Sequence, residues 1–71
     1  MGEKLQSTVE LGNRIRQARK THGWSQAMLA ERAGVSRPTV ARIEAGTDVS
    51  TVTLSMITEA LGLQLGLIAK D

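Results

Sequence analysis

Four segments of the chain repeat apolar residues at spacings of three and four, and a glycine follows each segment. Such spacings place side chains on one face of an α-helix, and glycine is the usual residue in the left-handed position that ends a helix. The pattern therefore predicts helices over about 8–21, 26–33, 37–45 and 51–61. The glycines that end them are Gly23, Gly34, Gly46 and Gly62.

A serine stands close before the expected start of each helix. Its hydroxyl can accept a hydrogen bond from the first helical turn, and Ser7 with Glu10 has the spacing of a capping box. Pro38 is tolerated in a first turn, where N–H groups lack helical partners. The other expected caps are Ser25, Ser36 and Ser50, and the expected inward residues are Leu11, Ile15, Ala18, Leu29, Ala30, Ala33, Val40, Ile43, Leu54, Ile57 and Leu61.

The last apolar segment, 63–68, fits two structures. Its three Leu residues alternate with Gln and Gly as in a strand, although its apolar residues also continue the helical face of Leu61. Gly62 and Gly66 each disfavour a continued helix by about 1 kcal/mol relative to Ala, so we favour a strand over a helix or a frayed tail. A lone strand needs a partner, most simply the same strand of a second copy. The expected dimer interface is Leu63, Gln64, Leu65, Gly66, Leu67 and Ile68.

The composition is that of one globular domain spanning residues 1–71, with 41% hydrophobic and 23% charged residues. The chain has no Cys and one His, so we expect no disulfide, no metal site and no cofactor. Its scattered carboxylates form no acid–base pair, which argues against an enzyme. No apolar run approaches the about 18 residues of a membrane span, and the N-terminus lacks a signal-peptide core, so we expect a cytoplasmic protein.

Positive charge is concentrated in the middle of the chain, although the net charge is only +2. Between residues 14 and 42 there are seven Lys and Arg residues and one carboxylate, Glu31, a local excess of six positive charges. A concentration of one sign favours a polyanionic partner, although charge alone fits a solvated surface equally well.

Segment 26–45 carries the functional prediction. Two short helices flank a turn at 34–36, which sets the second helix steeply across the first, and small Ala30 lies at the crossing. The outer face of the second helix stays polar, and an α-helix fits the major groove of DNA, where each base pair shows a distinct pattern of donors and acceptors. The expected base-reading residues are Ser36, Arg37, Pro38, Thr39, Ala41 and Arg42.

The chemistry of three of these residues suits base reading, and the preceding helix suits phosphate binding. Arg37 can donate two hydrogen bonds to guanine O6 and N7, and the small surfaces of Pro38 and Ala41 permit close approach to a thymine methyl. The free N–H groups at the start of the preceding helix suit a phosphate. The expected phosphate-binding residues are Ser25, Gln26, Thr39 and Arg42. As alternatives, the arginines are surface charges and the serines are helix caps.

Two ring residues precede this segment. Trp24, directly after a helix-ending glycine, favours packing over a base-stacking role. His22 near a helix end favours an interaction with the helix dipole over ligand binding.

Residues 11–62 resemble the lambda-repressor/Cro (XRE) family of helix-turn-helix domains. The resemblance implies four or five helices, dimeric operator binding and base reading from the start of the third helix. It also implies an ion pair between Arg19 and Glu44 that ties the third helix to the first. The matching residues are Gly23-Trp24-Ser25-Gln26, Leu29-Ala30, Gly34-Val35-Ser36, Thr39-Val40, Arg42-Ile43-Glu44 and Ala60-Leu61-Gly62.

Within that family, the Gly-Trp-Ser-Gln opening at 23–26 and the ending at 63–68 resemble HipB-type antitoxins. This narrower resemblance implies dimerisation through the strand, repression of the protein's own operon and a HipA-like kinase toxin as partner. Because the sequence ends at Asp71 without a long tail, any toxin contact is expected on the helical surface.

The sequence thus predicts an all-α domain that acts as a homodimeric repressor on a palindromic DNA operator, as the antitoxin of a HipBA-like toxin–antitoxin operon. Two alternatives stay open: a stand-alone or phage-type repressor without a toxin, and a protein-interaction module whose DNA binding is secondary.

Overall fold

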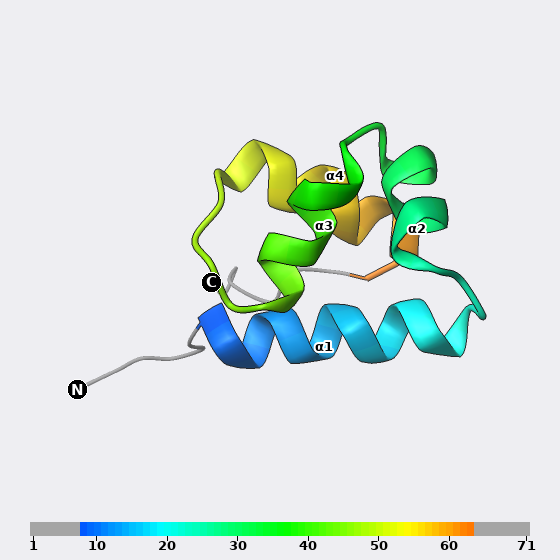
Figure 1. The fold of residues 1–71 in the computed structure, drawn as a ribbon, viewed down its shortest axis with the longest axis horizontal. Coiled ribbons are helices and arrows are strands. Elements are labelled where there is room, and N and C mark those ends of the chain that lie inside the picture. The colour runs from blue at the N-terminus through cyan, green and yellow to red at the C-terminus, as the bar shows by residue number, and fades with distance from the viewer. Residues whose placement is uncertain (1–7, 64–71) are drawn as a thin grey trace, which may run out of the picture.

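The computed structural model describes residues 8–63, which form an all-α fold without a strand. In Figure 1, α1 runs along the bottom, α2 stands at the right, and α3 lies above α1 and in front of α4 in this view. Contacts join α2 to α3 and α4, and α1 to α3 and α4. The four helices are α1 (Thr8–Thr21), α2 (Gln26–Ala33), α3 (Arg37–Glu44) and α4 (Thr51–Leu61).

The helix bounds coincide with the sequence pattern except at one end. α3 ends at Glu44, one residue before the predicted end, because Ala45 caps the helix and Gly46 takes a positive φ of 92°. The Gly46 N–H then donates to the Ile43 carbonyl at 3.0 Å.

Two other expectations fall at the edges of the described chain. Leu63, the first residue of the predicted strand, is not in a strand, and residues 64–68 lie outside the described residues. Ser7, the expected cap of α1, also lies outside them. A fifth helix is not present within residues 8–63.

Serine caps begin the other three helices. The side chains of Ser25, Ser36 and Ser50 each accept a hydrogen bond from the backbone N–H three residues later, at 3.1, 3.3 and 3.1 Å. Each such cap typically contributes about 1 kcal/mol to stability. The turn between α2 and α3 depends on Gly34, which caps α2 at φ 76°, a conformation that residues with a Cβ rarely adopt. Local chemistry therefore sets where α3 begins.

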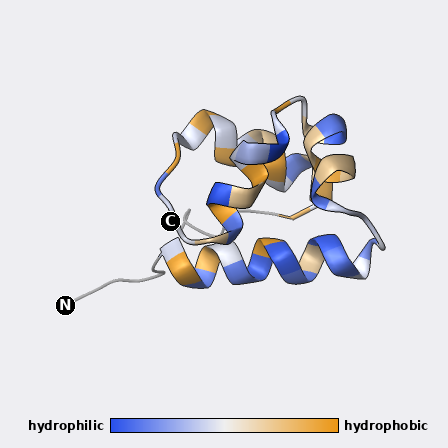
Figure 2. Cartoon of the chain, viewed as in Figure 1, coloured by the Kyte–Doolittle hydropathy of each residue, from blue (hydrophilic) through white to orange (hydrophobic). Residues whose placement is uncertain are grey.

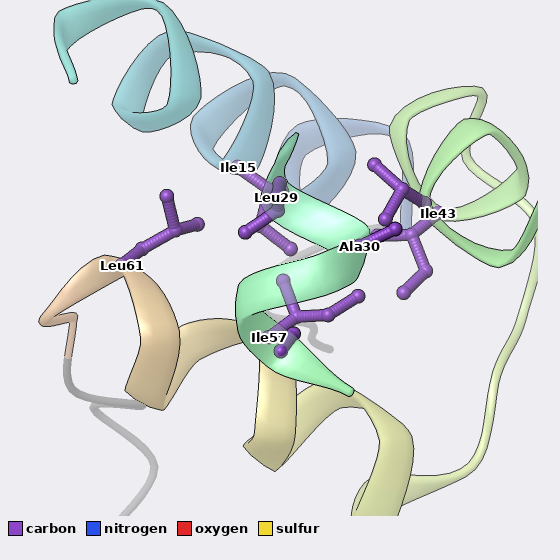
Figure 3. Close-up of a cluster of buried hydrophobic side chains, with 8 residues drawn as sticks. Ile15, Leu29, Ala30, Ile43, Ile57 and Leu61 are labelled. Carbon is purple, nitrogen blue, oxygen red and sulfur yellow. The ribbon is translucent and has the colours of Figure 1, made fainter. Parts of the chain in front are cut away.

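The core lies where the four helices meet, and Figure 3 shows side chains from all of them pointing into it. Figure 2 shows that most residues in the second half of α1 are hydrophilic. Of the predicted inward residues, Leu11, Ala18 and Leu54 are only partly buried. The buried ones are Ile15, Leu29, Ala30, Ala33, Val40, Ile43, Ile57 and Leu61.

Two core features are absent from the hydrophobic pattern. Thr58 is buried, and its hydroxyl donates to the Ser55 carbonyl at 3.1 Å, which satisfies the polar group locally. Gly12 is buried where α1 crosses α3, and a Cβ there would lie 2.3 Å from the carbonyl oxygen of Ile43. The backbones of α1 and α3 thus approach as closely as a glycine permits, which sets the position of the end of α3.

Candidate nucleic-acid interface

α3 turns one face to solvent and the other to the core. Val40 and Ile43 are buried behind it. On the outward face, Thr39 and Ala41 are half-buried. The exposed members of the predicted base-reading set are Ser36, Arg37, Pro38 and Arg42. The outward face is therefore accessible over both turns of the helix.

The hydroxyls at the start of α3 are occupied with each other. Ser36 Oγ accepts from the Thr39 N–H at 3.3 Å and lies 2.8 Å from Thr39 Oγ1. Ser25 is used in the same way at the start of α2, where it accepts from the Met28 N–H. These side chains are caps in the free protein, and each hydroxyl retains capacity for at least one further hydrogen bond.

Gln26 joins Arg37, an expected base-reading residue, to the body of the domain. Arg37 Nη1 donates to Gln26 Oε1 at 3.0 Å, and Gln26 Nε2 donates to Glu44 Oε1 at 3.2 Å. The Gln26 side chain on α2 thus bridges Arg37 at the start of α3 and Glu44 at its end, and it holds the Arg37 guanidinium beside the start of α2. An arginine has five N–H donors, and this contact uses one of them.

The network ends in an ion pair between Arg19 on α1 and Glu44 on α3. Arg19 Nε and Nη2 donate to Glu44 Oε2 and Oε1 at 2.6 and 3.0 Å, a bidentate geometry. Arg19 Nη1 also donates to the Trp24 carbonyl at 2.8 Å. The two side chains are only 11% and 5% exposed, so this is not a surface pair of negligible strength.

The pair changes the titration of both groups. The hydrogen bond to Glu44 raises the pKa of Arg19 despite the opposing effect of burial. Burial alone would raise the pKa of Glu44, but hydrogen bonds from Arg19 and Gln26, with the charges of Arg19 and Arg16, lower it overall. Glu44 is therefore ionised at neutral pH, and the network carries a full charge pair at the end of α3.

Trp24 is engaged within the domain. The half-buried Trp24 ring packs against the core, with the His22 ring stacked on it at 4.2 Å and the Arg32 guanidinium 4.6 Å from its centroid. His22 Nε2 lies 3.0 Å from the carbonyl oxygen of Leu61, the last residue of α4. These contacts join the ends of α1 and α4, and they favour packing as the role of Trp24.

The structure brings together residues that the sequence placed in separate roles. Arg37 was expected to read bases, Gln26 to bind phosphate, and Arg19 and Glu44 to pair, whereas all four lie in one hydrogen-bonded chain. Arg42 lies outside that chain and is exposed. Gly12 was missed, although a lone glycine within a helical pattern is a signal for close backbone packing.

The described part of the chain lacks the features of a membrane span and of a metal site. None of the four helices in residues 8–63 has the length and apolar composition that crossing a bilayer requires. The same residues contain no group of three His, Cys, Asp or Glu side chains arranged to bind a metal ion.

Two short helices joined by a glycine turn, with the second held apolar side down and polar side out, define a helix-turn-helix protein. The chain matches the helix-turn-helix family model HTH_3 over residues 15–68 and belongs to that family.

Two curated relatives share the name antitoxin HipB. The protein from Escherichia coli K12 is 31% identical over 51 residues, which cover 72% of this chain and 58% of HipB. The protein from Escherichia coli O6:H1 is 30% identical over 66 residues, which cover 92% of this chain and 70% of HipB. The chain thus spans little more than half of the K12 protein's length.

Solved structures of similar fold include three regulators or their complexes. The HipA–HipB–O2–O3 complex contains a chain that superposes with a TM-score of 0.79 at 26% identity, covering 97% of this chain and 99% of that one. The restriction-modification controller protein C.AhdI from Aeromonas hydrophila has a TM-score of 0.75 at 34% identity, covering 80% and 84%. SinR, a master regulator for biofilm formation solved with DNA, has a TM-score of 0.70 at 36% identity, covering 76% and 89%.

Proposed function

We propose that this protein is a sequence-specific DNA-binding repressor that acts as a homodimer on a palindromic operator. The observation that carries the proposal is the accessible outward face of α3, at whose start Arg37 is held by Gln26 at 3.0 Å. The similarity to SinR, which was solved in complex with DNA, supports it.

Base recognition falls to the first turn of α3. Arg37 directs two of its remaining donors to O6 and N7 of a guanine, a contact worth about 1–3 kcal/mol of discrimination against another base. Because Gln26 holds the guanidinium in the free protein, little side-chain freedom is lost on binding. Pro38 and Ala41 allow the helix to approach closely, and Ser36 adds a hydroxyl contact to a base edge.

Phosphate contacts orient α3 on the duplex. The start of α2, with Ser25 and Gln26, offers N–H groups to one phosphate, while Thr39 and Arg42 reach the backbone from α3. These contacts carry no sequence information but supply much of the affinity, so binding weakens steeply as salt rises.

Dimerisation is proposed through residues 63–68, paired with the same segment of a second copy. A two-fold dimer that places its two α3 helices about 34 Å apart reads two half-sites one turn of DNA apart. Sedimentation of the purified chain tests this state, since a monomer at micromolar concentration contradicts it.

The biological setting that we propose is a HipBA-like toxin–antitoxin operon, which the dimer represses and whose kinase toxin it binds. The two HipB relatives and the complex of HipB with HipA support this setting. The likeness to SinR and C.AhdI supports a stand-alone regulator as the second candidate. A kinase-like protein encoded beside this gene, captured stoichiometrically by the purified chain, decides for the first; its absence decides for the second.

The central experiment is selection of binding sites from random duplex DNA with the parent chain and with Arg37→Ala. We expect the parent to enrich a palindrome and the variant to lose the preference at one position in each half-site. Selection that enriches no sequence, or an Arg37→Ala variant with the parent's preference, contradicts the proposal.

A further inference from the structure

A polar groove of about 300 Å³ lies between the second half of α1 and the outward face of α3. Its lining includes two residues of the proposed DNA face, Gln26 and Ala41, and the Arg19–Glu44 pair. The α1 side of the groove adds Arg16 and Lys20. Because Ala41 and its neighbour Ala45 are small, the groove stays open where α3 meets α1.

The groove carries an excess of positive charge. Three cations line it against one carboxylate, and the two hydrogen bonds from Arg19 already engage Glu44. Arg16 and Lys20 are both exposed on α1, and the charge of Arg16 also contributes to lowering the pKa of Glu44. They stand four positions apart on α1, so they share one face about 6 Å apart along the helix axis.

We propose that Arg16 and Lys20 bind DNA backbone phosphates beside the bases that α3 reads. This inference rests on the proposed function. A duplex seated on Arg37 and Gln26 must pass its backbone over a neighbouring part of the surface, and the groove shares Gln26 and Ala41 with that face. Two exposed cations on one helical face match a run of negative charge rather than a single enclosed anion.

The assignment has a thermodynamic signature that a structural role lacks. Each phosphate contact releases condensed counterions, so the plot of log affinity against log salt steepens by about 0.9 per contact. The contacts of Arg16 and Lys20 are to the backbone, so losing them weakens binding to every sequence alike. A role in folding alone leaves the slope unchanged.

The test measures fluorescence anisotropy of a labelled duplex of about two helical turns and random sequence, between about 50 and 200 mM NaCl. The variants are Arg16→Gln, Lys20→Gln and the double substitution. Arg14→Gln is the matched control, because Arg14 is an equally charged, exposed residue of α1 that does not line the groove. Thermal unfolding of each variant checks that the fold is retained.

We expect the salt slope to fall by about 0.9 for each single variant, per bound subunit, and by about twice that for the double variant. Arg16→Lys, which keeps the charge, should restore the parent slope. The proposal is overturned if the folded double variant keeps the parent slope, or if Arg14→Gln lowers it as much. A parent chain that ignores DNA at low salt overturns the proposed function itself, a result distinct from either of these.

Discussion

Replacing Glu44 by Ala tests the network that holds α3. The substitution leaves Arg19 without its carboxylate partner at a site where its side chain is 11% exposed, and it removes the acceptor of Gln26. Arg19 would keep its hydrogen bond to the Trp24 carbonyl but would be a largely desolvated cation without a counter-charge.

The expected size of the effect follows from that geometry. Removing one partner of a fully buried ion pair typically destabilises a protein by about 3–5 kcal/mol, because the remaining charge is uncompensated. Arg19 and Glu44 are partly buried, so we expect the lower end of this range, about 3 kcal/mol, for Glu44→Ala. Glu44→Gln keeps an acceptor for Arg19 and loses only the charged part, for which we expect about 1.5–3 kcal/mol. A chain of this length has a total stability of roughly 4–10 kcal/mol, so Glu44→Ala removes a large share of it.

Thermal unfolding followed by circular dichroism measures both variants. For a domain of this size each kcal/mol lowers Tm by about 4–8 °C. Glu59→Ala is the matched control, since Glu59 is an exposed carboxylate on α4, and a change within about 0.5 kcal/mol is expected there. A Glu44→Ala variant no less stable than Glu59→Ala would refute the conclusion that the pair anchors α3.

Three further predictions follow from the same contacts. The pKa of Glu44 is lower in the folded state, so the stability that its ionised form contributes is complete above the unfolded pKa of about 4.3 and is lost as pH falls through the folded pKa. Urea unfolding from pH 7 to pH 3 should therefore show a smaller loss in the free energy of unfolding for Glu44→Gln than for the parent. Gly12→Ala should destabilise the domain by about 1–3 kcal/mol despite the better helix propensity of Ala, because the new Cβ meets backbone atoms of α3, which cannot rotate away as a side chain can. The control Asn13→Ala, at the neighbouring exposed position, should be neutral or stabilising. Equal Tm values for the two variants would contradict the close crossing of α1 and α3. Arg37→Ala should weaken operator binding by about 1–3 kcal/mol while leaving Tm unchanged, and Gln26→Ala should weaken operator binding by a smaller amount. Titration of a selected operator with each variant measures both effects. Full affinity of Arg37→Ala would show that Arg37 does not read bases.

The helices, the serine caps of α2, α3 and α4, and the turn between α2 and α3 could be predicted because each depends on residues close together in the chain. A serine caps the N–H three residues later, and Gly34 supplies a positive φ at its own position. The helical period likewise identified which residues face inward, since it repeats along one element. The period did not give the exact depth of burial, as for Leu54, which is partly rather than fully buried, and it did not identify the buried Thr58 and Gly12.

The sequence predicted which residues lie on the outward face of α3 but not how they are organised. The polar side of α3 follows from the same period that buries Val40 and Ile43. That Gln26 would hold Arg37, and that the same amide would reach Glu44, depends on how α2 crosses α3. The role of the Arg19–Glu44 pair came from a family resemblance, because nothing local brings together charges 25 positions apart.

By itself, the sequence determined the positions of the four helices and the polarity of their faces, because hydrogen bonding and side-chain period act within a few residues. The tertiary structure alone decided the close crossing at Gly12, the hydrogen-bonded network from Arg37 to Arg19 and the polar groove lined by Arg16 and Lys20. Those features depend on interhelical distances and angles, which emerge only when all four helices share one core.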